Sequence, residues 1–239
     1  SIESGLKELH EKGVDEVLLI PLYPQFAMAT TETILVLAQE IRKAQFPNMK
    51  FRSIPAFYND EDYVKSLSNS IQRDLNKGNY DYLLFSYHGV PERHIKKSDV
   101  TKSHCKIDGS CCNTPSAAHE FCYRPPCYQN TKHVVHSFGL EGGKYGTSFQ
   151  SRLGRDPWLQ PYTDATIDGL AQKGIKNLAV VTPAFVSDCL ETLEEIGMEA
   201  AESFHENGGE NFHTIPCLND DDEWCEVLAK WIGEFKNSN

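Results

Sequence analysis

Short apolar runs alternate with longer amphipathic segments along the chain, and this alternation constrains its fold more than any other feature. Continuous apolar runs such as residues 82–87 and 177–182 are typical of buried parallel strands, which other elements cover on both faces. Segments such as residues 60–76 and 220–236 have apolar residues at the spacing of an amphipathic helix. The alternation predicts an α/β protein with doubly wound parallel sheets.

The order of the elements predicts two such units. We expect helices over residues 3–12, 30–44, 60–76, 162–173, 187–205 and 220–236, and strands over residues 15–23, 51–57, 82–87, 144–149, 177–182 and 212–217. Residues 1–54 would belong to the first domain, residues 55–218 to the second, and residues 219–239 to a C-terminal helix that packs back toward the first. An α/β domain normally opens with a strand, so a chain that starts in a helix leads us to expect a truncated first domain.

Composition excludes some classes of protein. The net charge of −11 argues against a nucleic-acid partner, because phosphate binding needs a basic stripe. No apolar run approaches the roughly 20 residues that a membrane-spanning helix needs, so we expect no transmembrane segment. We expect a cytoplasmic protein, and the sequence leaves association with a membrane surface open.

Two segments with reactive side chains follow predicted strands, at the edge where open α/β sheets bind ligands. The first places His88 on a Gly-Val-Pro turn directly after residues 82–87. Such a histidine either acts on a ligand or only hydrogen-bonds to the loop backbone, and both readings stay open. The second segment has Glu191, Glu195 and Glu199 on one helix face, although like charges at this spacing repel each other. That row either faces water or binds a cation.

Flat aromatic and basic side chains cluster in the remaining segments at strand ends. Tyr23 follows the first strand, and the long segment after residues 144–149 contains Arg152, Arg155 and Trp158. Together with a histidine and a glutamate, these residue types suit a large, planar, anionic ligand.

Five segments, in this order, resemble the protoporphyrin ferrochelatase family: YPQF (23–26), SYHGVP (86–91), FQSRLGRDPWLQPYTD (149–164), SDCLETLEE (187–195) and IPCLN (215–219). The resemblance covers almost the whole chain except a cysteine-rich loop at residues 92–128. It implies insertion of Fe(II) into protoporphyrin IX, the last step of protohaem synthesis. It also implies two Rossmann-like halves of the chelatase type, with the porphyrin in the cleft between them.

The resemblance assigns the two central roles to His88 and Glu191, which would face each other across the macrocycle and contact the Fe(II) substrate. A neutral imidazole can accept a proton from a pyrrole nitrogen or donate a lone pair to the metal. Carboxylates can pass a metal ion along and carry protons away. Whether His88 takes the proton or delivers the iron stays open.

The resemblance also implies supporting residues. Asp188, Glu195 and Glu199 match the acidic helix face of the family, which often carries a π-bulge at the site. Asp188 and Glu195 would lie at the substrate, and Glu199 would relay the metal. The other expected substrate contacts are Trp158 on the porphyrin wall, Ser151 and Arg152 near a propionate, and Tyr23 near the pocket.

Two alternatives to a ferrochelatase stay open. A cobalt or nickel chelatase of tetrapyrrole metabolism shares the architecture but relies on more histidines at the metal. A non-catalytic haem or metal carrier would use the same cleft without turnover. Family members usually have a further N-terminal segment that forms one lip of the porphyrin site, so we expect reduced activity from this 239-residue species.

Five of the eight cysteines lie within 23 residues, which points to a metal or cluster site rather than to a disulfide scaffold. Some bacterial ferrochelatases resemble this chain in having a cysteine-rich insertion that holds a [2Fe–2S] cluster. Four thiolates are needed for such a cluster. We favour Cys105, Cys112, Cys122 and Cys127, with Cys111 in reserve. A zinc site of four cysteines, or of three with His104 or His119, is the alternative, and free thiols are a third.

Overall fold

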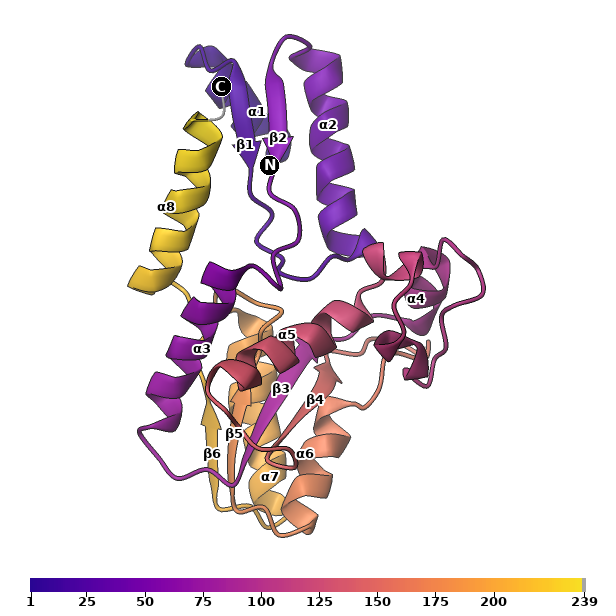
Figure 1. The fold of residues 1–239 in the computed structure, drawn as a ribbon, viewed down its shortest axis with the longest axis vertical. Helices are drawn as coiled ribbons and strands as arrows, with labels where there is room; N and C mark the ends of the chain where they lie inside the picture. The colour runs from indigo at the N-terminus through magenta and orange to yellow at the C-terminus, as the bar shows by residue number, and fades with distance from the viewer. Residues whose placement is uncertain (238–239) are drawn as a thin grey trace.

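The computed structural model describes residues 1–237 and contains two parallel sheets of unequal size (Figure 1). The smaller sheet pairs β1 (Glu16–Leu19) with β2 (Lys50–Ser53). The larger has the order β4-β3-β5-β6, with strands Tyr145–Gln150, Tyr82–His88, Asn177–Val181 and Asn211–Thr214. All neighbouring strands are parallel, so the prediction of an α/β protein with parallel sheets is confirmed.

Both faces of the larger sheet are apolar, as its uninterrupted hydrophobic runs predict. On β3, Leu83 and Phe85 face the core shared with α3 (Glu61–Leu75) and α5 (Arg124–Ser137). Leu84 points the other way, into the core shared with α6 (Thr163–Gln172) and α7 (Ala201–Glu206). The helices therefore cover the sheet on both sides, as Figure 1 shows.

The smaller unit has its own core. Leu6 of α1 (Ile2–Glu11), Val17 of β1 and Phe46, just after α2 (Thr33–Gln45), pack together with Met49. Both β1 and β2 are shorter than predicted, since Pro21 and Pro55 follow them and proline cannot donate to a strand ladder. The expected boundary at residues 54–55 falls in the link between β2 and α3 and stays a prediction.

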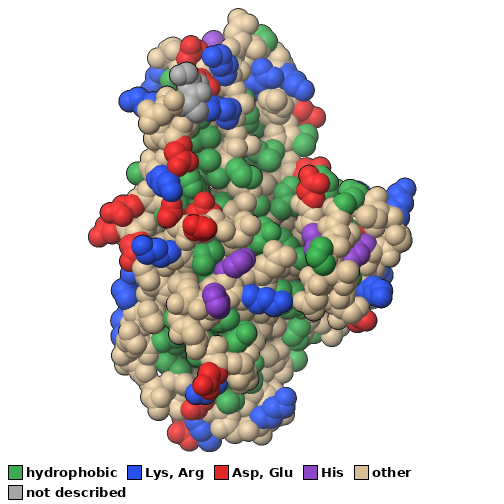
Figure 2. All heavy atoms as spheres, in the orientation of Figure 1, with side chains coloured by type: hydrophobic (Ala, Val, Ile, Leu, Met, Phe, Trp, Pro, Cys, Tyr) green, Lys and Arg blue, Asp and Glu red, His purple; other side chains and the backbone are tan. Residues whose placement is uncertain are grey.

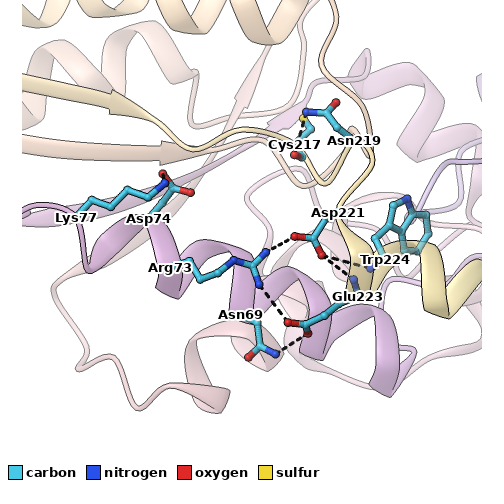
Figure 3. A network of polar contacts seen from close by, with 9 residues as sticks. All are labelled: Asn69, Arg73, Asp74, Lys77, Cys217, Asn219, Asp221, Glu223 and Trp224. Atoms are coloured by element: carbon cyan, nitrogen blue, oxygen red, sulfur yellow. Dashed lines mark hydrogen bonds and ion pairs between the residues drawn. The ribbon is translucent and has the colours of Figure 1, made fainter.

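The last helix, α8 (Asp222–Asn237), joins the two units, running from the larger sheet toward β1 and β2 in Figure 1. At its start, Arg73 of α3 forms ion pairs with Asp221 and Glu223, and Asn69 also binds Glu223 (Figure 3). Near its end, Phe235 lies under the guanidinium of Arg52, which also donates to the carbonyl oxygen of Phe235 at 2.8 Å. Residues 238–239 of the predicted C-terminal segment lie outside the described residues.

Two helical segments have π-type hydrogen bonding. The helix predicted over residues 187–205 begins only at residue 190. From there η4 (Glu191–Ala200), a π-helix, continues into α7. A second π-helix, η1 (Met28–Glu32), precedes α2. Such segments are rare and occur mostly at functional sites. The π-bulge expected from the family resemblance is therefore present at the acidic face.

The prediction of a loop over residues 92–128 is wrong in part. This stretch contains α4 (Glu92–Ser98), two single 3₁₀ turns, η2 (Ser110–Asn113) and η3 (Ala117–Glu120), and the start of α5. Pro125 and Pro126 occupy the first turn of α5, where the missing N–H groups cost nothing. No helix is expected there from the sequence, so α5 is an addition to the predicted elements.

We expect the packing of α8 to stabilise the larger core. Trp224 is 2% exposed and contacts the rings of Phe57, Tyr63 and Trp231. Trp224→Ala should lower the free energy of unfolding by about 3–5 kcal/mol, because it opens a cavity among these rings. The measurement is urea unfolding, with Ile232→Ala on the same helix as a control; Ile232 is 51% exposed. Equal loss from both variants would contradict this packing.

Candidate active site

A cleft of about 600 Å³ lies between the two sheets, within the range of about 300–1,000 Å³ that is usual for small-molecule sites. One wall consists of residues 19–23 and neighbours in the smaller unit, and the other of residues 88–91, 158 and 184–187 of the larger unit. Figure 2 shows apolar side chains gathered in the region between the two units. The structure therefore brings the predicted residues Tyr23, His88 and Trp158 together in one cleft.

His88 is the last residue of β3 and presents one ring nitrogen to the cleft. Its Nδ1 lies 2.6 Å from the carbonyl oxygen of Gly89. Since a carbonyl oxygen only accepts, Nδ1 of the neutral ring carries the proton and Nε2 has a free lone pair. Trp158 and Phe185 flank the imidazole, with ring centroids 6.3 and 6.1 Å away. The backbone contact expected as an alternative to catalysis therefore exists, and it prepares the other nitrogen to accept a proton.

Gly89 allows the strand ends to close around this histidine. A Cβ atom on Gly89 would lie 2.9 Å from the carbonyl oxygen of Gln150 and 3.2 Å from Trp158. The Gly89 N–H donates to that same carbonyl oxygen at 2.8 Å. Trp158 is held in turn by its indole N–H, which donates to the carbonyl oxygen of Leu153 at 3.0 Å.

Glu191 opens the π-helix η4 and lies within electrostatic reach of His88. The pKa of its carboxyl is below the ordinary value, first because the side chain of Cys189 hydrogen-bonds to it, then because of a backbone N–H, with a smaller effect from His88. The hydrogen bond and the nearby imidazole both favour the ionised carboxylate. His88 ends one strand and Glu191 begins the helix that follows another, so both lie at the same edge of the sheet, although only His88 is among the residues that line the cleft.

The carboxylate of Asp188 is held by hydrogen bonds to neighbouring segments. Its carboxylate accepts from Asn219 Nδ2 at 2.7 Å, from the hydroxyl of Thr192 at 3.1 Å and from the N–H of Cys217 at 3.2 Å. These bonds lower the pKa of Asp188 despite its partial burial. Asp188 therefore ties the start of η4 to the segment after β6, and it does not line the cleft.

Four other predicted residues line a second cavity of about 260 Å³ on the far side of the β4 end: Ser151, Arg152, Glu195 and Glu199. Arg152 is ion-paired there with Asp164 at 2.6 Å, and its guanidinium lies 4.4 Å from the ring centre of Tyr162. Glu195 accepts from the backbone N–H of Ser151 at 2.6 Å and from its hydroxyl. The expected contacts of these residues with porphyrin or metal remain predictions.

Sequence reasoning missed two glutamines of the site. Gln25 is buried and lines the cleft, and its amide donates to the carbonyl oxygen of Pro183 at 3.2 Å, which joins the two walls. Gln150 is also buried and contacts both Ser86 and the backbone of Glu191. Both residues are part of quoted motifs, but their partners lie far away in the sequence, so no local pattern reveals their roles.

Comparisons with known proteins show which family the chain belongs to. A family model described as Ferrochelatase matches residues 1–235. The chain belongs to the ferrochelatase family. The ferrochelatase of Pseudomonas syringae pv. tomato is 46% identical over 230 residues, which are 96% of this chain and 67% of that protein. The ferrochelatase of Opitutus terrae is 44% identical over 232 residues, 97% of this chain and 67% of its own length.

Among solved structures, SirB from Bacillus subtilis with Fe3+ is similar to this chain with a TM-score of 0.56. The similarity covers 93% of this chain and 72% of SirB at 12% identity, so it shows the fold alone. The predicted ferrochelatase family and a chelatase-like α/β fold are confirmed.

The cysteine-rich segment of this ferrochelatase is organised around Arg124, whose side chain is 1% exposed. Its Nε donates to the sulfur of Cys112 at 3.1 Å, and one Nη lies 3.4 Å from the sulfur of Cys111. The guanidinium also donates to the carbonyl oxygens of Lys106 and Ile107. A buried positive charge is thus directed at two of the five thiols.

The thiols of the segment lie near enough to one another to affect each other's pKa. Burial raises the pKa of Cys112 to about 11 and that of Cys122 to about 12, and it raises the pKa of Cys105. Burial also acts on Cys111, but a backbone N–H and Arg124 outweigh it and lower the pKa of that thiol. All eight cysteines are free, and among residues 1–237 no three potential ligands are arranged to hold a metal ion.

Cys105, Cys111 and Cys122 nevertheless line one small closed cavity of about 10 Å³. His104 and His119 line it as well, with their Nε2 atoms 3.3 Å apart. The number of thiols, their burial and the positive charge of Arg124 beside them suit a thiolate-bound group. The donor chemistry therefore suits the expected cofactor, although the ligands are not in place.

Asp99 anchors the start of this segment, and we expect its contribution to depend on pH. Its carboxylate accepts from the hydroxyl of Thr101 and from the N–H groups of Thr101, His104 and Cys105 at 2.7–2.9 Å. These bonds, that of the Thr101 hydroxyl first, lower the pKa of Asp99 from 3.8 to about 2. The stability that Asp99 contributes is therefore complete above pH 3.8 and is lost as the pH falls toward 2.

The measurement is urea unfolding of the wild type and Asp99→Asn from about pH 7 downward. The difference between the two should stay constant at neutral pH and shrink below pH 3.8. Thr101→Val, which removes the hydroxyl donor, should make this contribution smaller and complete its loss at a higher pH, because it raises the folded-state pKa of Asp99 toward 3.8. A difference that is the same at every pH would show that Asp99 is not held as described.

Proposed function

We propose that this chain carries out the reaction of its family, insertion of Fe(II) into protoporphyrin IX, in the cleft between the two sheets. The observation that carries the proposal is that His88 lines an apolar cleft while Glu191, close enough for His88 to lower the pKa of its carboxyl, begins the helix at the same sheet edge. Metallation replaces two pyrrole N–H protons by one divalent ion, so the site needs a proton acceptor and a cation-binding group. His88 and Glu191 supply them.

On one face of the ring, we assign proton removal to His88. Its Nε2 holds the lone pair because Nδ1 donates to the carbonyl oxygen of Gly89. Trp158 and Phe185 surround the imidazole with apolar surface, which is unsuitable for a hydrated cation but suitable for a porphyrin ring. This environment favours proton acceptance over iron delivery as the role of His88.

On the other face, we assign the Fe(II) substrate to Glu191. The carboxylate stays ionised because its pKa is lowered, and hard oxygen ligands bind divalent iron without holding it as tightly as thiolates do. Glu195 and Glu199, in the second cavity beyond Gln150, extend the acidic row of η4. They would relay the metal or accept released protons.

Apolar and aromatic residues on both walls would hold the macrocycle. Tyr23 and Leu22 belong to the smaller unit and Trp158 and Val186 to the larger, and all four line the cleft. We interpret the two sheets as two Rossmann-like units of unequal size with the porphyrin between them. The amide of Gln25 on Pro183 would fix the spacing of these units.

Variants of the two central residues test the proposal. His88→Ala and Glu191→Gln should each lower the rate of porphyrin metallation by about 10²–10⁴-fold, because each removes a proton acceptor or a charge at the reacting centre. Porphyrin binding, measured by fluorescence, should be retained. His205→Ala and Glu202→Gln on α7 are matched controls that should keep full activity. Unchanged metallation in both site variants would contradict the proposal, and porphyrin binding without turnover in the wild type would indicate a carrier.

We also propose that the cysteine segment holds a [2Fe–2S] cluster through Cys105, Cys112, Cys122 and Cys127. Cys105 and Cys112 lie close enough to Cys122 to affect its pKa, and Cys122 and Cys112 affect that of Cys127. Cys111 stays in reserve as a ligand, since its sulfur also accepts hydrogen bonds, from the N–H of Lys106 at 3.2 Å and from Arg124. When bound, such a cluster cross-links the segment and exchanges one electron.

Iron, sulfide and zinc analysis of anaerobically purified protein tests this assignment. We expect two irons and two sulfides per chain with visible absorption. Cys122→Ser should lose both, whereas Cys111→Ser and the exposed control Cys225→Ser should keep them. Colourless protein with one zinc per chain would instead support a zinc site that includes His104 or His119. Protein with neither metal would contradict a metal site altogether.

We propose a cytoplasmic location with contact to membrane surfaces. Among residues 1–237, none of the helices combines the length and apolar character that crossing a bilayer requires. Leu22 at the cleft is 42% exposed, and Leu153, whose carbonyl holds Trp158, is 80% exposed. Exposed apolar side chains near the cleft suit the uptake of an apolar substrate from a membrane surface.

A further inference from the structure

The end of β4 contacts the π-helix at two consecutive residues. Gln150, the last residue of the strand, is 3% exposed, and its amide nitrogen lies 3.3 Å from the carbonyl oxygen of Glu191. Ser151 follows, and its backbone N–H and hydroxyl both donate to the carboxylate of Glu195. One strand end thus holds η4 at two positions that are four residues apart.

The same strand end is bound to the strand that carries His88. In the parallel register, His88 pairs with Gln150, and the Gly89 N–H donates to the Gln150 carbonyl oxygen at 2.8 Å. The side-chain oxygen of Gln150 accepts from the hydroxyl of Ser86 at 2.7 Å. Gln150 therefore has its backbone on the His88 strand and its side chain on the backbone of Glu191.

The contact of Ser151 with Glu195 is made in a strained backbone conformation. Ser151 has a φ of 65°, a left-handed conformation that residues other than glycine rarely adopt. In this conformation both of its donors reach Glu195. A glycine would fit the backbone better but would lack the hydroxyl, so the hydroxyl rather than the turn accounts for serine here.

We propose that Gln150 and Ser151 form a positioning pair that holds η4 against β3 and so sets the separation of His88 and Glu191. The inference rests on the proposed function for its catalytic consequence, although the contacts themselves do not depend on it. A change of about 1 Å in such a separation can cost about 100-fold in rate. As a member of this pair, Ser151 has a role different from the propionate contact that the family resemblance implies.

Two substitutions separate positioning from stability. Gln150→Met keeps the size of the side chain but removes both hydrogen bonds, and Ser151→Gly removes the hydroxyl while relieving the left-handed strain. Gln172→Met is the matched control, because the Gln172 amide also makes a hydrogen bond, to Asn207 at 2.8 Å, at an exposed site on α6. Amide hydrogen exchange of residues 191–200, porphyrin affinity, and the kcat and KM of metallation are measured for each.

We expect faster exchange in η4 and a kcat lowered about tenfold or more for Gln150→Met and Ser151→Gly, with porphyrin affinity and KM unchanged. Ser151→Gly should be at least as stable as the wild type, which a purely structural role for the hydroxyl would not allow. Unchanged exchange and kcat in both variants would overturn the inference. If the wild type itself does not metallate porphyrin, the proposed function fails while the exchange of η4 still tests the positioning pair.

Discussion

The parallel pairing of β3 with β4 on one side and β5 on the other is the constraint on which the site depends. Parallel strands end at the same edge of a sheet, so the segments that follow them meet there. One brings His88, another Gln150 and Ser151, and the third leads into η4 with Glu191. Apolar cores on both faces hold the strands in place, and the reactive groups are only as well positioned as those cores allow.

The sequence predicts the parts of the site that local patterns encode. Continuous apolar runs predict β3 and β5, the motifs at their ends single out His88 and Glu191, and the motif after β4 singles out Trp158. The helix α5 could not be predicted in this way, because its buried face includes the polar residues Asn130 and Thr131 and so lacks the apolar spacing of an amphipathic helix. The separation of the cleft from the second cavity could not be predicted either. Nor could the contacts of Gln150, whose partners Ser86 and Glu191 lie 64 and 41 residues away along the chain.

The cysteine segment and the cleft share residues, so they are physically continuous. Tyr123 lines the cleft, and its carbonyl oxygen accepts from the thiol of Cys127 at 3.3 Å. Phe121, in the same segment, packs edge-on against Phe26 with ring centroids 5.8 Å apart. Figure 1 shows this segment beside the lower end of α2. A metal or cluster in the segment would therefore stiffen one wall of the substrate site without any contact with the reacting atoms.

A crystal structure of this chain with metal-free porphyrin bound would test the central claim most directly. We expect the ring in the cleft between residues 19–23 and Trp158, with His88 Nε2 over one face of the pyrrole nitrogens and the carboxylate of Glu191 over the other. A ring bound elsewhere, or one with both side chains on the same face, would contradict the division of proton removal and metal delivery between these two residues.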